Sequence, residues 1–254
     1  IDIIFYVIIS LITLSLLLFT NEYRPDAGLY HLPYTQILNE NKIIIGISNL
    51  HFRFGHISII QYLSAFNINF LTGREGIIIP LASITSFVYL YFIYDLYKLV
   101  KRKENISIGK LFSLVIVLYI SYKINRYGEY GNDAPAHLSL FFIISYFLYN
   151  SHIKYSSFYL LTLISTFIFA NKVFLGLCFI LPLYLLIKRK SFFLKIFISV
   201  PSIFFALWFL KNILITGCLL YPIKNSCLKN LEWTDINRTE IVQVESEAWS
   251  KAWP

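Results

Sequence analysis

Seven apolar runs separated by polar loops constrain the fold of this chain more than any other feature. A helix that spans a bilayer needs about 17–25 largely apolar residues, and aromatic and hydroxyl residues extend the shorter runs towards that length. Hydrophobic residues make up 57% of the chain and charged residues only 14%, against about 25% charged in soluble domains. The pattern predicts an all-α membrane bundle with about seven transmembrane helices. The runs cover residues 3–19, 77–94, 111–122, 136–149, 158–170, 173–187 and 192–215.

The basic residues orient this predicted bundle. They cluster in two loops, one between the second and third runs and one between the sixth and seventh. Cytoplasmic loops carry an excess of Lys and Arg, so we assign both loops, with Arg102 and Arg189, to the cytoplasm. The segments that then face outward are 20–76, 123–135, 170–173 and 216–254.

Most of the polar residues that stand out fall in these outer segments. We expect Asp26, Asp133, Lys172 and Cys227 outside. The cores of the spans are nearly free of charge, with Asp95 as the exception. The net charge of +8 comes largely from the two basic loops. It therefore argues against a nucleic-acid partner, which requires basic residues on a soluble face.

We interpret the chain, residues 1–254, as a single transmembrane domain that is truncated at both ends, because it has no Met and stops in a polar tail. Its first outer loop, residues 20–76, is too long for a simple turn. Apolar residues at helical spacing predict two interfacial helices in this loop, over about residues 28–39 and 57–70. The outer tail covers residues 216–254.

A carboxylate and an imidazole follow the first run closely, in Asp26-Ala27-Gly28-Leu29-Tyr30-His31-Leu32-Pro33. On a helix, Asp26, Tyr30 and His31 fall on overlapping faces and can converge. We interpret Asp26 and His31 as catalytic candidates, and Tyr30 as a substrate-binding candidate, at a reaction centre that faces a lipid-borne substrate. The alternative is that Asp26 caps the helix that follows it.

A similar pattern occurs in the outer loop between the third and fourth runs. Asp133 stands two residues before Pro135, at an expected helix start, and His137 follows one turn later. Capping is again the alternative for the carboxylate. Because two such patterns face the same side, we interpret Asp133 as catalytic and His137 as substrate-binding.

Two cations are candidates for binding an anionic lipid headgroup. Lys172 lies in the shortest outer connection, and the alternative is a lysine that only extends its ammonium to the membrane surface. That alternative is preferred for Lys211. Arg53 has the planar guanidinium that suits phosphate, and its alternative is an ordinary loop arginine. His51, close to Arg53 in the sequence, is a further substrate-binding candidate.

The cysteines and the missing motifs add two expectations. Cys218 and Cys227 lie in the outer tail, where an oxidising exterior allows a disulfide between them; the alternative is two buried thiols. Cys178 lies in a span and is interpreted as a small apolar filler. No His-x-x-x-His pair, Gly-rich phosphate loop or Gly-x-Ser-x-Gly elbow occurs in the sequence, so no metal site is predicted.

The layout resembles the GT-C superfamily of polytopic glycosyltransferases, which use polyprenyl-phosphate-linked sugars. The resemblance rests on a first span, a long outer loop with two interfacial helices and an early aspartate, Asp26, and a second acidic site, Asp133, in the next outer loop. The Asp26–Pro33 stretch is similar to a motif of a poorly characterised bacterial group in that class. So are Asn-Leu-His-Phe-Arg-Phe-Gly at 49–55 and Thr-Gly-Cys-Leu-Leu-Tyr-Pro at 216–222.

The resemblance implies transfer of a sugar from a polyprenyl-phosphate donor to an acceptor hydroxyl, with inversion, at the outer face of a bacterial inner membrane. It implies Asp26 as general base and Lys172 and Arg53 as the groups that stabilise the leaving phosphate. The acceptor is a glycan, a lipid or a protein, and membrane lipid surrounds the chain. No Asp-x-Asp or Glu-x-Asp pair lies near Asp26, which favours chemistry without a metal or cofactor and leaves a divalent metal open. The groups expected to orient the base or hold sugar hydroxyls are Asp133, His31 and His137.

Two other function classes stay open. One is a transporter or flippase of an anionic or lipid-linked substrate, which requires ionisable groups at mid-depth in the membrane. The other is a non-catalytic assembly scaffold. Glycosyl transfer makes one geometric demand that helix capping does not. It requires Asp26, His31, Asp133 and Lys172 to line one outward-open cavity that reaches the lipid boundary.

Overall fold

Helices make up all the regular secondary structure in the described part of the chain. The only β-type pairings in that part are two isolated bridges, Asn69 with Gly73 and Cys218 with Cys227. The predicted all-α class is therefore confirmed. The computed structural model describes residues 2–19, 25–56, 58–102, 105–127, 130–150, 154–197 and 199–252.

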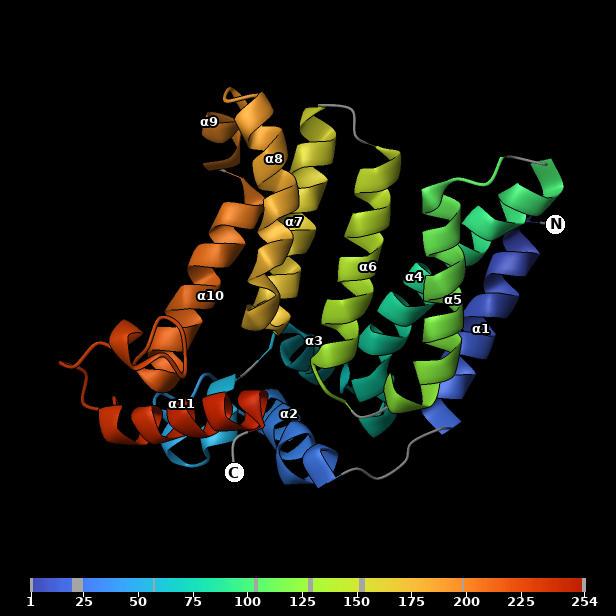
Figure 1. The fold of residues 1–254 in the computed structure, drawn as a ribbon. Coiled ribbons are helices and arrows are strands. Elements are labelled where there is room, and N and C mark those ends of the chain that lie inside the picture. Colours follow the sequence, from blue (N-terminus) through green and yellow to red (C-terminus); the bar gives the residue numbers. More distant parts are fainter. Residues whose placement is uncertain are drawn as a thin grey trace.

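The long helices stand beside one another as a bundle (Figure 1). Each apolar run supplies one of these helices. The apolar face of each helix is buried by packing against the apolar faces of its neighbours. Ile78, Phe92, Ile120, Leu161 and Leu185 are among the fully buried side chains of the shared core. The helices of the bundle are α1 (Asp2–Phe19), α4 (Ile79–Arg102), α5 (Ile108–Tyr127), α6 (Asp133–Tyr149), α7 (Tyr155–Asn171), α8 (Ile180–Lys188) and α10 (Val200–Thr216).

The last two apolar runs do not form single α-helices. The run at 173–187 begins as a 3₁₀ segment, η5 (Val173–Phe179), before α8. The prediction of one helix over 192–215 was wrong, because this run is divided between a short helix, α9 (Phe192–Phe197), and α10. Ser199 is extended, and Pro201 stands in the first turn of α10, where a proline can begin a helix but not continue one.

Length and hydropathy identify one clear membrane-spanning candidate among the described residues. It is the helical stretch Arg74–Arg102, which joins η4 (Arg74–Ile78) to α4. The other apolar helices found by the same criteria are shorter: Ile3–Leu17, Tyr155–Asn171, Val173–Lys188 and Val200–Thr216. By these criteria the described residues include one possible membrane span.

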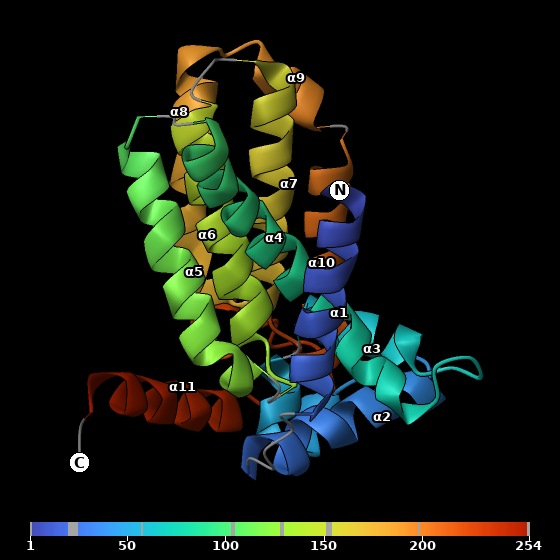
Figure 2. The same ribbon diagram turned by 90° about the vertical axis from the view of Figure 1, so that its right-hand side faces the viewer.

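A layer of short helices covers one end of the bundle (Figure 2). The first predicted interfacial helix corresponds to a π-helical turn, η1 (Ala27–His31), followed by α2 (Leu32–Glu40). The second corresponds to α3 (Ile59–Asn67). The remaining segments of this layer are η2 (Ile47–Asn49), η3 (Phe52–His56), η6 (Lys224–Ser226) and α11 (Ile236–Lys251).

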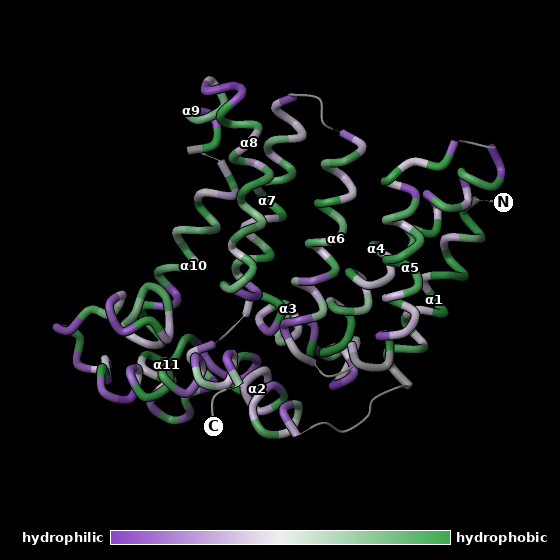
Figure 3. The backbone as a smooth tube through the Cα atoms, in the orientation of Figure 1, coloured by the Kyte–Doolittle hydropathy of each residue, from purple (hydrophilic) through white to green (hydrophobic). Residues whose placement is uncertain are grey.

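Hydrophilic residues gather at both ends of the bundle, and the helices between them are mostly hydrophobic (Figure 3). In the view of Figure 1, α4 and α8 finish at the upper end, so Arg102 and Lys188 lie there, whereas α6 begins and α7 finishes at the lower end. The residues predicted to face opposite sides of a membrane thus lie at opposite ends of the bundle.

The chain's tail is bound to the first loop at this lower end. The predicted disulfide Cys218–Cys227 is present, and Cys178 is a buried free thiol, as expected. The indole N–H of Trp233 donates to the carbonyl of Ile213 at 2.9 Å, and the amide of Asn49 donates to the carbonyl of Trp233 at 2.8 Å. These contacts hold α11 across the lower end, where it helps to enclose a cavity.

Candidate active site

A cavity of about 570 Å³ lies at the lower end of the bundle, and we call it the main cavity. Segments from η1, η3 and α3, the start of α6, the end of α7, α10 and α11 border it. Asp26, His31, Asp133 and Lys172 all line it. The prediction that these four side chains converge on one cavity is confirmed, although they come from three distant segments of the chain.

Asp26 does not act as a helix cap. Its backbone is helical, with φ −61° and ψ −34°, and its side chain makes no capping hydrogen bond. Instead, its carboxylate lies close to the hydroxyl of Tyr30, one turn later. Burial, together with the charge of Asp26, raises the pKa of Tyr30 to about 12. Tyr30 therefore stays protonated beside the carboxylate at the cavity wall.

His31 is a buried, neutral group. Burial lowers its pKa to about 4, against the opposing influence of Asp26 and Asp133. Its Nδ1 lies 3.1 Å from Nε2 of Gln61. Because Gln61 Oε1 accepts from the N–H of Ser58 at 3.1 Å, the amide nitrogen of Gln61 is the one that faces His31. The imidazole Nδ1 is then an acceptor, which leaves the proton on Nε2 as a donor.

Asp133 and Lys172 form an ion pair on the cavity wall. Lys172 Nζ lies 2.7 Å from Asp133 Oδ1, and the two side chains are 28% and 64% exposed. Asp133 is the first residue of α6, and no side-chain cap precedes that helix. This carboxylate therefore binds a cation instead of capping, and the ammonium group is fixed beside the cavity.

Arg53 supplies a second cation to the main cavity. Its guanidinium lies 5.4 Å from the ring centre of Tyr30 and 5.1 Å from that of Phe52, within the range of cation–π contact. Burial lowers the pKa of the neighbouring His56 to about 4, and the charge of Arg53 adds to this shift. The cavity thus holds two carboxylates, two cations and two neutral histidines.

The family comparison covers almost the whole chain. The model of the family described as "Domain of unknown function (DUF8201)" matches residues 1–251. The chain belongs to this family. No curated protein matches the DUF8201 chain, and no solved structure matches it either. Its function must therefore be argued from the chemistry of the site.

Uncharged polar residues form much of the inner wall of the DUF8201 cavity, and sequence reasoning missed them. Asn171 Oδ1 accepts from the N–H of Ile60 at 3.0 Å, and Asn132 Nδ2 donates to the carbonyl of Asn171 at 2.8 Å. Trp208 Nε1 donates to the carbonyl of Ala170 at 3.2 Å. These bonds join the start of α3, the start of α6 and the middle of α10 to the end of α7. They fix the position of Lys172, which follows α7.

Close packing of the η3 backbone against the Tyr221 ring shapes another part of the wall of the main cavity. A Cβ atom added to Gly55 would lie 2.5 Å from the Tyr221 ring. Gly55 and Tyr221 both line the main cavity, and only a residue without a side chain lets η3 pack against this ring. The sequence signal was present, because both residues belong to the motifs at 49–55 and 216–222.

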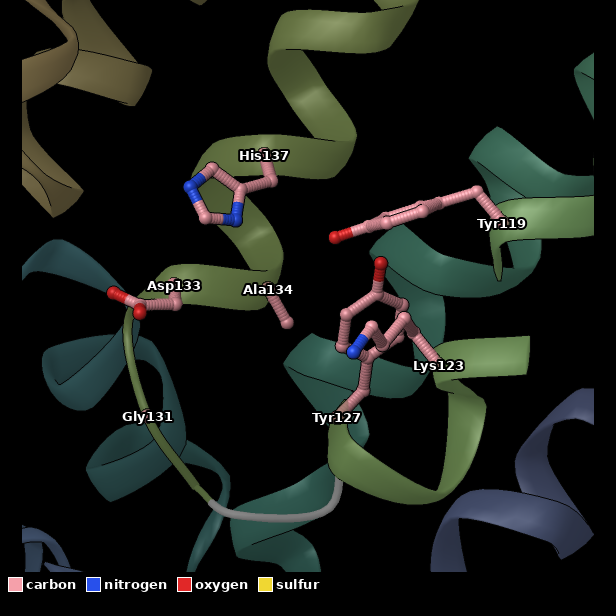
Figure 4. A pocket seen from close by; sticks show the side chains of 7 residues that line it. All are labelled: Tyr119, Lys123, Tyr127, Gly131, Asp133, Ala134 and His137. Carbon is pink, nitrogen blue, oxygen red and sulfur yellow. The ribbon is translucent and has the colours of Figure 1, made fainter. Parts of the chain in front are cut away.

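Two predicted substrate-binding residues lie outside the main cavity. His51 packs against Phe52 and Phe54, with ring centres 5.0 and 5.3 Å apart, and its Nδ1 accepts from the N–H of Arg53 at 3.3 Å. The 3₁₀ turn of η3 brings His56 to the cavity in its place. His137 lines a separate, smaller cavity on the other side of Asp133 (Figure 4).

Proposed function

We propose that the DUF8201 chain is a multi-span membrane glycosyltransferase of the GT-C type, with its site on the outer face. The observation that carries this proposal is the main cavity, where Asp26, Asp133, Arg53 and Lys172 meet at one end of an apolar bundle. A carboxylate base close to two phosphate-binding cations is the arrangement that glycosyl transfer from a lipid phosphate requires.

Exposed apolar side chains support several membrane-spanning helices in addition to Arg74–Arg102. They extend along the outer faces of α1, α5, α8 and α10, with Ile3 77%, Leu118 62%, Ile187 74% and Leu207 57% exposed. Soluble proteins rarely expose apolar surface on this scale. Helices α6, α7 and α10 have 17 residues each, the short limit for a bilayer span.

Small hydroxyl residues between the helices support the same conclusion. Ser113, Ser139, Ser145, Ser157 and Ser165 are all buried in the bundle. In membranes, helices pack closely through small residues and through hydrogen bonds of their hydroxyl groups. The Tyr91 and Ser145 hydroxyls, 3.4 Å apart, are one such contact between α4 and α6.

The surroundings of the main cavity favour a donor with an apolar tail. Phe174 and Trp249, both lining residues, are 84% and 87% exposed. An apolar groove of about 580 Å³ lies between α7 and α10 and includes Phe205. The Phe205 ring packs against Trp208, which lines the main cavity, at 6.5 Å between centres. A polyprenyl chain in the groove would leave its phosphate near Lys172.

The proposed reaction uses the two kinds of charge separately. The acceptor hydroxyl, on a glycan, lipid or protein, attacks the anomeric carbon and forms the new glycosidic bond while its proton passes to Asp26. The bond between that carbon and the phosphate oxygen breaks, and polyprenyl phosphate leaves with the electron pair. Lys172 and Arg53 stabilise the charge that develops on the phosphate. His31 offers its Nε2–H to a sugar hydroxyl.

An assay of sugar transfer in proteoliposomes tests the role of Asp26, with an extract of polyprenyl-phosphate sugars as donor. The Asp26→Asn variant should lose about 10²–10⁴-fold in rate, as expected for removal of a general base. Asp235→Asn is the matched control. Asp235 caps α11 by accepting from the N–H of Arg238, and an amide caps equally well. Normal turnover by Asp26→Asn would contradict the proposal.

The multi-span topology has its own test, independent of catalysis. Single cysteines introduced as Asp133→Cys and Arg102→Cys should react with a membrane-impermeant maleimide from opposite sides of sealed vesicles. Reaction of both from the same side would overturn the orientation. It would also remove the lipid-borne donor from the proposal.

A further inference from the structure

A second, smaller cavity lies between the lower part of α5 and the start of α6, and we call it the small cavity. Its volume is about 210 Å³, below the roughly 300–1,000 Å³ of sites for drug-sized ligands. In Figure 4, Tyr119, Lys123 and Tyr127 extend from α5 towards the start of α6, whereas the Asp133 carboxylate points away from them. The side chains that line the small cavity are Tyr119, Lys123, Tyr127, Asp133, Ala134 and His137.

Two lining hydroxyl groups lie next to each other. Tyr127 is only 7% exposed, and its hydroxyl interacts with that of Tyr119. In Figure 4 both hydroxyls face the space between the two helices. Each phenol oxygen both donates and accepts hydrogen bonds, so the pair retains positions that a ligand in the small cavity can bind.

The lining is polar and mostly uncharged, which suits a hydroxyl-rich ligand. The Asp133 charge is compensated by Lys172 at 2.7 Å, and Lys123 is the other charged lining residue. Two phenol groups, an imidazole, an ammonium and a carboxylate provide both donors and acceptors. The tyrosine rings add apolar faces. A single sugar ring presents hydroxyl groups at its edge and C–H groups on its faces, and its size fits the volume.

The small cavity adjoins the main cavity at one shared residue and one close contact. Asp133 lines both cavities. Gly131 lines the small one, and a Cβ atom added to it would lie 3.4 Å from Nε2 of His31, which lines the main one. A group in the small cavity is therefore held next to the side chains proposed to act on the acceptor.

We propose that the small cavity binds one neutral sugar unit of the acceptor, so that the acceptor is a glycan. The inference rests on the proposed function, because it assigns the acceptor class for that reaction. Tyr127 and His137 bind hydroxyl groups of this sugar, and Asp133 forms the boundary between the acceptor and the donor phosphate.

Saturation-transfer NMR on the full chain tests this assignment, in micelles of a detergent without a sugar headgroup. The probes are glucose, galactose, mannose and N-acetylglucosamine, each alone, with inorganic phosphate as the anionic comparison. At least one sugar should bind. Tyr127→Phe should weaken that binding about fivefold, the effect of one neutral hydrogen bond. Ala134→Leu, which fills the small cavity, should abolish it.

Two controls separate the site from the fold and from the proposed function. Tyr122→Phe removes an exposed hydroxyl from the same helix and should leave sugar binding unchanged. Asp26→Asn lies only in the main cavity and should retain sugar binding while losing transfer. Thermal unfolding shows whether each variant is folded.

The outcomes that overturn the inference are also specific. It is overturned if none of the four sugars binds, if Ala134→Leu binds as well as the unaltered chain, or if phosphate displaces the sugar. If sugar binding follows the expected pattern but Asp26→Asn still transfers, the proposed function fails and the small cavity remains a sugar site.

Discussion

The two ends of the bundle each carry an ion pair of lysine and aspartate, and the two pairs differ in their burial and in their hydrogen-bond partners. At the upper end, Lys110 Nζ lies 2.6 Å from Asp95 Oδ1, with side chains only 6% and 14% exposed. At the lower end, Lys172 and Asp133 are 2.7 Å apart but 28% and 64% exposed. Both pairs border a pocket, but the surrounding helices cover the upper pair almost completely, whereas the lower pair is open to the main cavity.

Their hydrogen-bond partners show what this difference means. The Asp95 carboxylate accepts further bonds from the hydroxyls of Ser113 at 2.7 Å and Tyr149 at 2.8 Å. It therefore joins α4 to α5 and α6 with both oxygens occupied. Asp133 has one partner among the described residues, Lys172, on one of its oxygens. A carboxylate whose two oxygens both have protein partners stabilises the fold. A carboxylate with one oxygen open to a cavity can bind a ligand.

The largest expected effect is on stability, at the upper end. The Asp95→Asn variant leaves the Lys110 ammonium without its buried counter-charge, which should lower the free energy of unfolding by about 3–5 kcal/mol. Chemical or thermal unfolding in detergent measures this. Asp95→Leu combined with Lys110→Met removes both charges and should recover most of the loss. If the single variant were as stable as the unaltered chain, the structural role of the pair would be refuted.

The next effect is on activity, at the lower end. Lys172→Ala should reduce sugar transfer by about 10²–10³-fold, the usual result of removing one group that stabilises developing charge. Its unfolding free energy should change by only about 0–1 kcal/mol, because the pair is exposed. Transfer rates and unfolding curves on the same preparation measure both. A loss of stability comparable to that of Asp95→Asn would show that the lower pair also stabilises the fold, and the proposed difference between the two pairs would be refuted.

The sequence predicted the helices well because burial of apolar residues dominates their formation. Every apolar run became helical. The break in the last one ends at Ser199, which precedes α10 with Pro201 in its first turn, and this helix-start signal is present in the sequence. The acids and Lys172 were found because charged groups are rare in this chain and are nearly absent from the apolar runs, so those in the connecting loops stand out. Charge patterning thus located the lower end of the bundle.

Tertiary contacts decided the rest. Gln61, Asn132 and Asn171 carry no charge and occur in no motif, so only the folded chain reveals that they fix His31 and the end of α7. The choice of His56 over His51 as a lining residue depends on the turn of η3, which the sequence pattern does not specify. The small cavity needs α5 and α6 in register, and no local signal encodes that register.

The smallest expected effect is a pH dependence that belongs to the lower end. The described histidines all lie there, and burial lowers the pKa of His31 to about 4, against about 6.5 in an unfolded chain. Between these pH values the unfolded state binds more protons than the folded state. His31 therefore makes stability fall as the pH drops through this window, and it adds no pH dependence above the window. At pH 5.5 the loss of stability from His31 is about 1 kcal/mol.

The His31→Asn variant keeps an acceptor for Gln61 but does not titrate. Its melting temperature should therefore fall less than that of the unaltered chain between pH 7 and pH 5.5, whereas the Asp95→Asn variant should retain the full pH dependence. Equal slopes for His31→Asn and the unaltered chain would show that His31 is solvated, and the lower end would then lose its neutral imidazole donor.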